Sequence, residues 1–222
     1  MPPLQGVTRH LLIINVLMYF GTLLVMHEPG STISHGVETI EWNRYWLASF
    51  FPTSEYFRSW QIATHMFMHG SIQHLAFNMF SLYMFGTMVE MVWGAKRFLF
   101  FYLTCGLGAW LLHIGATAWE INHAPNAMEA EIIKNIPMLG ASGAIFGVLA
   151  GFGLLFPNNV IQLLFPPIPM KAKYFVLIMA GLDLYLGISG NGAGVAHFAH
   201  VGGAIFGALL YFYWDGFRKP RL

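Results

Sequence analysis

The stretch GASGAIFG at residues 140–147 and the stretch HVGGAIFG at residues 200–207 share the pentapeptide GAIFG in apolar surroundings. Each copy has two glycines four residues apart, namely Gly143 with Gly147 and Gly203 with Gly207. This small-xxx-small spacing lets the backbones of two membrane helices approach closely. The first copy directly follows a serine, Ser142, and the second begins three residues after a histidine, His200. Close packing of the two segments would let these side chains meet.

The composition is that of a membrane protein. Of the 222 residues, 56% are hydrophobic and 9% are charged, whereas about a quarter of the residues of a soluble protein are charged. The formal net charge of +1 argues against nucleic acid as a partner. The single cysteine, Cys105, cannot form an internal disulfide.

Six apolar stretches approach the length of about 20 residues that spans a bilayer. They lie at 11–26, 71–89, 98–119, 137–156, 174–189 and 192–214, and only the fifth carries an acid, Asp183. Their continuous apolar character argues against a transmembrane barrel. We therefore expect residues 1–222 to form a single all-α membrane domain, a bundle of six helices with short cytoplasmic tails at both ends.

The distribution of Lys and Arg predicts the orientation. With the amino terminus inside, eight basic residues lie on the inner side: Arg9, Lys96, Arg97, Lys171, Lys173, Arg218, Lys219 and Arg221. Three lie on the outer side: Arg44, Arg58 and Lys134. The long first outer loop, at 27–70, carries eight aromatic residues that favour the membrane interface: Trp42, Tyr45, Trp46, Phe50, Phe51, Tyr56, Phe57 and Trp60.

Polar side chains inside membrane spans are candidates for function, and four of them are expected at one depth. Ser142 lies about five residues into its predicted span and His200 about eight, which at about 1.5 Å per residue places both roughly 8 to 12 Å below the outer end. His74 and Asn78 lie four residues apart in the outer third of the second span, on one helical face. A cavity opening to the outer side would supply the water that these groups need.

The four side chains suit acyl transfer. A serine nucleophile needs a base, and neutral imidazole is suited to that role near pH 7. Ser142 and His200 can thus form a two-residue serine hydrolase site. Ser142 lies near a helix amino terminus with unpaired N–H groups, and His74 and Asn78 can add side-chain donors for an oxyanion.

At these residues the sequence resembles the rhomboid family of intramembrane serine proteases, through GASG around Ser142, HVGGAIFG beginning at His200, and HLAFN at 74–78. The resemblance implies that Ser142 is the nucleophile and His200 its general base. It implies that His74 and Asn78 line the oxyanion site with the backbone at Ser142, and that Gly140 gives the preceding loop room. Gly143, Gly147, Gly203 and Gly207 would support the packing of the two helices.

The resemblance also implies roles outside the catalytic pair. Phe146 lies where family members often carry an aromatic residue against the catalytic histidine, and we interpret Glu90 as structural. Gln61 stands where relatives often have arginine, which bears on the anchoring of the first loop. Expected substrates are single-span membrane proteins with small residues at the cleavage site and a helix that unwinds easily. No metal or organic cofactor is expected, and a bacterial inner membrane is the expected location.

Several alternatives remain at the level of sequence. His197 lies close to the helical face of His200, where we expect it at the rim of the site or behind His200. Asp183 can orient His200, although the family works with two residues. His65 and His69 are read as interfacial hydrogen-bonding groups. Two rival functions are a membrane metal or haem protein, with ligands from His65, His69, His74, His197 and His200, and a non-catalytic protein that binds membrane helices. A transporter fits less well, because the polar groups lie on one side of the membrane.

Overall fold

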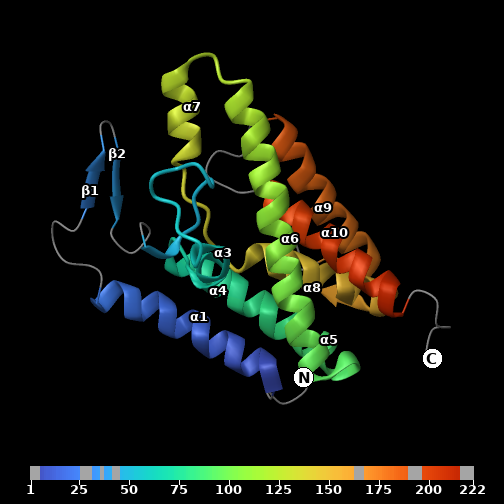
Figure 1. Ribbon diagram of the computed structural model, residues 1–222. Coiled ribbons are helices and arrows are strands. Elements are labelled where there is room, and N and C mark those ends of the chain that lie inside the picture. Colours follow the sequence, from blue (N-terminus) through green and yellow to red (C-terminus); the bar gives the residue numbers. More distant parts are fainter. Residues whose placement is uncertain are drawn as a thin grey trace. The chain divides into compact units, whose positions relative to one another are not determined.

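The computed structural model describes residues 6–25, 32–35, 38–41, 46–162, 168–189 and 197–215, which are mostly helical (Figure 1). The longer helices are α1 (Gly6–Val25), α4 (Ile72–Ser81), α5 (Thr87–Trp93), α6 (Ala95–Asn122), α7 (Ala127–Lys134), α8 (Ser142–Leu155), α9 (Ala172–Ser189) and α10 (His197–Trp214). Short α3 (Gln61–Thr64) continues into the 3₁₀ turn η1 (His65–Phe67). The π-helix η2 (Leu82–Gly86) joins α4 to α5.

The helices identify an integral membrane protein. Among the described residues, four helical spans are long and apolar enough to cross a membrane: Gly6–Leu24, Ile72–Trp93, Ala95–Asn122 and Ala172–Ser189. Helix α8 is apolar but has only 14 residues. On α9, Leu177 is 68% exposed and Ile188 is 72% exposed, as expected for side chains that face lipid. The count of six spans stays a prediction.

The predicted boundaries differ from the observed helices by several residues. Helix α1 begins at Gly6, five residues before the predicted span, and α6 extends beyond 98–119 at both ends. The span predicted at 137–156 becomes helical only at Ser142. Some predictions lie outside the described residues: the beginning of the sixth span at 192–196, the aromatic residues Trp42 and Tyr45, and the basic residues Arg44, Arg218, Lys219 and Arg221.

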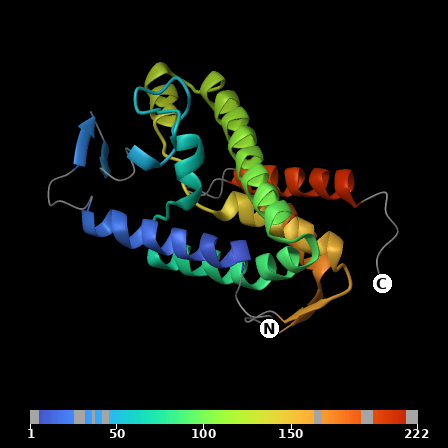
Figure 2. The same ribbon diagram turned by 60° about the horizontal axis from the view of Figure 1, so that its bottom comes forward.

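Two small antiparallel sheets and helix α7 were not predicted. Strand β1 (Thr32–His35) pairs with β2 (Glu38–Glu41), and β3 (Val160–Gln162) pairs with β4 (Pro169–Lys171). Figure 2 shows the β3–β4 pair as a hairpin beyond the end of α8. Strands of three or four residues are too short for the alternation of apolar and polar residues that identifies a strand in a sequence.

The described residues fall into two compact units. The first comprises the described parts of Met1–Arg9, Ser81–His113 and Ser142–Leu222, and the second those of His10–Phe80 and Ile114–Ala141. In the first unit, α8 packs against α10 and α9. The first part of α6 contributes Phe98, Phe101, Tyr102 and Cys105, which are all fully buried. The single domain over 1–222 stays a prediction.

Glu90 on α5 caps the amino terminus of α1. Its carboxylate accepts hydrogen bonds from the backbone N–H of Val7 at 2.6 Å, the N–H of Thr8 at 2.8 Å and the hydroxyl of Thr8 at 2.6 Å. The first N–H groups of a helix have no partner within it, and the helix dipole favours a negative charge there. Gly6 has φ +70°, and a Cβ at this position would overlap the Glu90 carboxylate. These contacts fit the structural role expected of Glu90.

Candidate active site

Ser142 is the first residue of α8, and not about five residues inside a helix as predicted from the sequence. The preceding segment is extended because Met138 pairs with Ser49, donating to its carbonyl at 2.7 Å and accepting from its N–H at 2.8 Å. Gly140 has φ +132°, a conformation that favours glycine and is incompatible with a helix. Its N–H donates to the carbonyl of His65 at 2.9 Å. The serine therefore stands where a loop turns into a helix.

His200 lies in the first described turn of α10 and contacts Ser142. The Oγ of Ser142 is 2.8 Å from Nε2 of His200, within hydrogen-bonding distance. One helical turn after Ser142, Phe146 stacks on the imidazole of His200, with ring centroids 4.3 Å apart and an interplanar angle of 4°. A serine and a histidine in this geometry can act as nucleophile and base.

The glycines of the two repeated segments lie where α8 and α10 touch. A Cβ on Gly203 would overlap the carbonyl group of Gly143, and a Cβ on Gly207 would lie 2.6 Å from the carbonyl oxygen of Gly147. On the other side of α8, a Cβ on Gly143 would overlap Ala109 of α6. The helix backbones are therefore in direct contact at a level just beyond Ser142, and a side chain here would separate the helices.

Asp183 of α9 contacts two histidines of α10. Its Oδ1 lies 2.9 Å from Nδ1 of His200 and 2.6 Å from Nδ1 of His197. Asp183 and His197 are buried, at 7% and 8% exposed, so His197 lies behind His200 and not at the rim. The sequence left two possibilities open, a site of two residues and a site in which Asp183 orients His200. The only signal for a contact between Asp183 and His200 was an acid within an apolar stretch. Its simultaneous contact with His197 had not been anticipated.

The proposed oxyanion residues His74 and Asn78 belong to the second unit. Asn78 is buried, and its Nδ2 has no hydrogen-bond partner among the described residues. His74 donates its backbone N–H to Ser71 Oγ at 3.1 Å, and its ring meets that of His69 edge to face at a centroid distance of 5.0 Å. Burial and the neighbouring His74 lower the pKa of His69 to about 4. The amide of Asn78 is thus a buried donor still available for a ligand.

Gln61 and His65 hold the loop before α4 together. Gln61 is fully buried; its Oε1 accepts from the N–H of Arg58 at 2.9 Å, and its Nε2 donates to the carbonyl of Tyr56 at 3.1 Å. His65 is also buried, and its Nδ1 donates to the carbonyl of Gln61 at 2.9 Å. Burial lowers the pKa of His65 to about 4. Gln61 thus helps to hold this part of the first loop in place, and His65 is a buried hydrogen-bonding residue.

The metal hypothesis can be compared with the side chains that lie together. Within the part of the chain that the structure describes, one group of three metal-binding side chains has its ligand atoms within 4.8 Å of one another: Asp183, His197 and His200. This group shares two histidines with the set considered from the sequence. The carboxylate oxygen already makes hydrogen-bond contacts to both rings.

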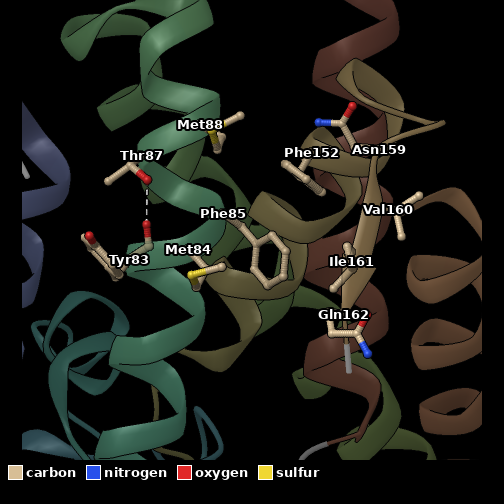
Figure 3. Close-up of a pocket in the computed structure, with 10 residues that line it drawn as sticks. All are labelled: Tyr83, Met84, Phe85, Thr87, Met88, Phe152, Asn159, Val160, Ile161 and Gln162. Atoms are coloured by element: carbon tan, nitrogen blue, oxygen red, sulfur yellow. Dashed lines mark hydrogen bonds between the residues drawn. The ribbon is translucent and has the colours of Figure 1, made fainter. Parts of the chain in front are cut away.

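A cavity of about 310 Å³ lies elsewhere in the first unit (Figure 3). It is lined by residues of η2, α5, α8 and the segment through β3: Tyr83, Met84, Phe85, Thr87, Met88, Phe152, Asn159, Val160, Ile161 and Gln162. Thr87 turns its hydroxyl to the carbonyl of Tyr83 at 2.6 Å, which leaves a mostly apolar lining. Neither Ser142 nor His200 lines this cavity, so the polar cluster and the apolar cavity are separate features.

Comparison with known proteins assigns a family to this arrangement. The profile of the Rhomboid domain matches residues 56–215. Rhomboid protease AarA of Providencia stuartii is 29% identical over 207 residues, which cover 92% of this chain and 71% of that protein. Rhomboid protein 1, mitochondrial, of Saccharomyces cerevisiae is 33% identical over 154 residues, or 66% of this chain and 39% of that protein.

A third relative is similar over a comparable part of the chain. Rhomboid protease GluP of Bacillus subtilis is 28% identical over 148 residues, which cover 67% of this chain and 24% of that protein. The chain thus spans well under half the length of the yeast and Bacillus relatives. The shared region includes Ser142 and His200, because both lie within the matched domain.

Proposed function

This chain belongs to the rhomboid family, and on that premise we propose that it is an intramembrane serine endopeptidase. It hydrolyses a peptide bond in or near the transmembrane segment of another membrane protein. The observation that carries the proposal is the 2.8 Å contact between Ser142 Oγ and His200 Nε2. Two relatives that bear the name rhomboid protease support it.

The reaction follows from the two side chains. The hydroxyl of Ser142 gives its proton to Nε2 of His200 while its Oγ bonds to the carbonyl carbon of the scissile peptide. The imidazolium then passes this proton to the leaving nitrogen as the C–N bond breaks. Water attacks the resulting ester and gives its proton to His200. The imidazolium then returns this proton to Oγ of Ser142 as the bond between Oγ and the acyl carbon breaks, which restores the serine and releases the carboxylic acid product. No metal or organic cofactor takes part in these reaction steps.

Donors for the oxyanion come from backbone and side chains. Ser142 begins α8, so the N–H groups of the first turn have no partner within the helix. We assign His74 and Asn78 as further donors, and the unpartnered buried Nδ2 of Asn78 supports this assignment. Donors aimed at the developing negative charge stabilise the transition state more than the substrate. Gly140 serves the same site by allowing the extended loop that ends at Ser142.

The substrate is a membrane helix that can open. A continuous helix hides its carbonyl carbons behind side chains and its carbonyl oxygens in hydrogen bonds, so Ser142 requires a locally unwound segment. Small residues at the cleavage site and a weak helix, as the family resemblance implies, meet this requirement. The bilayer itself is the second partner, because it presents substrate and enzyme in the same plane.

We place the chain in a bacterial inner membrane, with six spans, both termini in the cytoplasm and the site opening outward. The excess of Lys and Arg on the predicted inner side supports this orientation. Single cysteines at Asn126 and Lys171 test it, because Cys105 is fully buried. A membrane-impermeant maleimide added to intact cells should label Asn126→Cys and spare Lys171→Cys; the reverse pattern would invert the topology.

Labelling with a fluorophosphonate probe tests the activity. The probe reacts with serines that have an active base, so detergent-purified wild type should be labelled, and Ser142→Ala and His200→Ala should not. Labelling of His200→Ala at the wild-type rate would remove His200 as the base. Folded wild type that stays unlabelled in several lipid conditions would contradict the proposed activity and favour a protein that binds membrane helices without cutting them.

A further inference from the structure

One carboxylate oxygen of Asp183 contacts two imidazole rings. Its Oδ1 lies 2.9 Å from Nδ1 of His200 and 2.6 Å from Nδ1 of His197. An ionised carboxylate only accepts hydrogen bonds. Each ring must therefore carry its proton on Nδ1 to donate it to this oxygen.

This proton placement decides what His200 can do. With the proton on Nδ1, the lone pair of Nε2 faces Ser142 Oγ at 2.8 Å. With the proton on Nε2, the ring would turn an N–H toward the serine and could not accept its proton. Asp183 therefore favours the tautomer in which His200 is a base, and its charge also stabilises the imidazolium that forms on proton transfer.

We propose that Asp183 is a positioning residue for the catalytic pair, holding His200 in the Nδ1–H tautomer and completing a Ser142–His200–Asp183 triad. This inference rests on the proposed function. Phe146 lies parallel to the ring of His200 and fixes its plane, while the carboxylate fixes the rotation of the ring within that plane. The two contacts together leave the imidazole one orientation toward the serine.

His197 steadies the carboxylate. It donates from Nδ1 to the same oxygen, and its Nε2 is buried without a hydrogen-bond partner among the described residues. The hydrogen bond of the His197 ring is therefore made to Asp183 and not to Ser142. An asparagine at this position keeps an N–H donor near the place of Nδ1, whereas phenylalanine keeps the ring and removes the donor.

Asp183, His197 and His200 carry side chains that can bind a metal ion. The distances between their atoms, however, favour hydrogen bonds over metal coordination. Zinc bound at about 2.0 to 2.1 Å in a tetrahedral site holds its ligand atoms about 3.3 Å apart. The contacts of Oδ1 with the two ring nitrogens, at 2.6 and 2.9 Å, are shorter and have the length of charge-assisted hydrogen bonds.

Two measurements on the full chain in detergent micelles test the inference. The first is the rate of fluorophosphonate labelling as a function of probe concentration for wild type and Asp183→Asn. We expect the maximal rate to fall by about 10⁴-fold, the loss seen when a triad aspartate is replaced by asparagine, with little change in the half-saturating concentration. Glu120→Gln, which alters an exposed acid of α6, should label at the wild-type rate.

The second measurement is the NMR spectrum of the imidazoles in protein labelled with ¹⁵N-histidine. The signals of His200, identified by their loss in His200→Ala, should show the proton on Nδ1 in wild type and a shift toward Nε2–H in Asp183→Ala. A purely structural role for Asp183 would not fix this tautomer. The spectrum of wild type decides the question even if the Asp183 variants do not fold.

The outcomes separate this inference from the proposed function. Wild type that labels readily while His200 carries its proton on Nε2 overturns the triad and leaves the pair of Ser142 and His200 intact. Labelling of Asp183→Asn within about threefold of wild type does the same. Wild type that does not label at all overturns the proposed function, and the triad falls with it. Rapid labelling of His197→Asn but slow labelling of His197→Phe supports the steadying role of His197.

Discussion

The ring of Phe146 lies parallel to the imidazole of His200, with 4.3 Å between centroids and 4° between planes. Phe146 is one helical turn beyond Ser142 on α8. The helix that carries the nucleophile therefore also carries the ring that supports the base. The stack holds the ring with its edge, and thus Nε2, toward the serine. Loss of the stack should therefore lower the reaction rate more than it lowers the stability of the fold.

Phe146→Ala should lower the rate of fluorophosphonate labelling by up to about tenfold, since an aromatic pair contributes about 0.5 to 1.5 kcal/mol beyond its buried area. Phe146→Tyr keeps the ring and should retain most of the rate. The measurement is the labelling rate of both variants beside wild type. Equal rates for Phe146→Ala and wild type would show that the stack does not orient His200.

Gly203→Val should abolish labelling and lower the unfolding temperature, because its side chain would overlap the carbonyl of Gly143 and overpacking costs about 1 to 3 kcal/mol or more. Gly181→Ala is the matched control: a Cβ at this position of α9 meets nothing within 4 Å. Alanine there should raise stability by up to about 1 kcal/mol through its helix propensity. A Gly203→Val variant with normal labelling would refute the packing argument.

Glu90→Ala should destabilise the protein by about 2 kcal/mol or more, since hydrogen bonds to a buried charged group contribute about 1.5 to 3 kcal/mol. The change leaves the N–H groups of Val7 and Thr8 and the Thr8 hydroxyl without their acceptor. Thermal unfolding in detergent measures the loss. Glu129→Gln, on exposed α7, should melt with wild type, and a Glu90→Ala variant that did so as well would rule out a capping role.

Because His65 is buried and has a lowered pKa, we expect the free energy of unfolding to fall as the pH is lowered. Burial lowers its pKa from 6.5 to about 4, so between these values the unfolded chain binds a proton that the folded chain does not. Stability is full above about pH 6.5 and decreases toward pH 4, by up to about 3 kcal/mol at 1.36 kcal/mol per pKa unit. Unfolding curves at pH 7 and pH 5 measure the decrease.

His65→Asn is the comparison for this pH effect, because asparagine can donate to the carbonyl of Gln61 but does not titrate. Its stability should change less between pH 7 and pH 5 than that of wild type. His69, whose pKa is also lowered to about 4, keeps its own share of the dependence in both proteins. A pH dependence that His65→Asn leaves unaltered would assign the whole effect to other groups.

The sequence predicted those features that depend on residue type and spacing. The glycines four residues apart indicated where α8 and α10 approach, and the serine and histidine beside them do lie in contact. The beginning of α8 was misplaced because the pairing of Met138 with Ser49 is a contact between distant segments, which no local pattern reveals. The double contact of Asp183 was missed for a similar reason: spacing along α9 gives no distance to α10.

The π-helix at Leu82–Gly86 gives the chain one place that tolerates a change in length. A π turn holds one residue more than an α turn, so deleting a single residue here can convert it to α-helix while the flanking helices keep their faces. The same deletion between Ser142 and Phe146 would rotate the rest of α8 by about 100° and carry the aromatic ring away from the histidine. Loss of a single residue should thus be accommodated in η2 and excluded from α8.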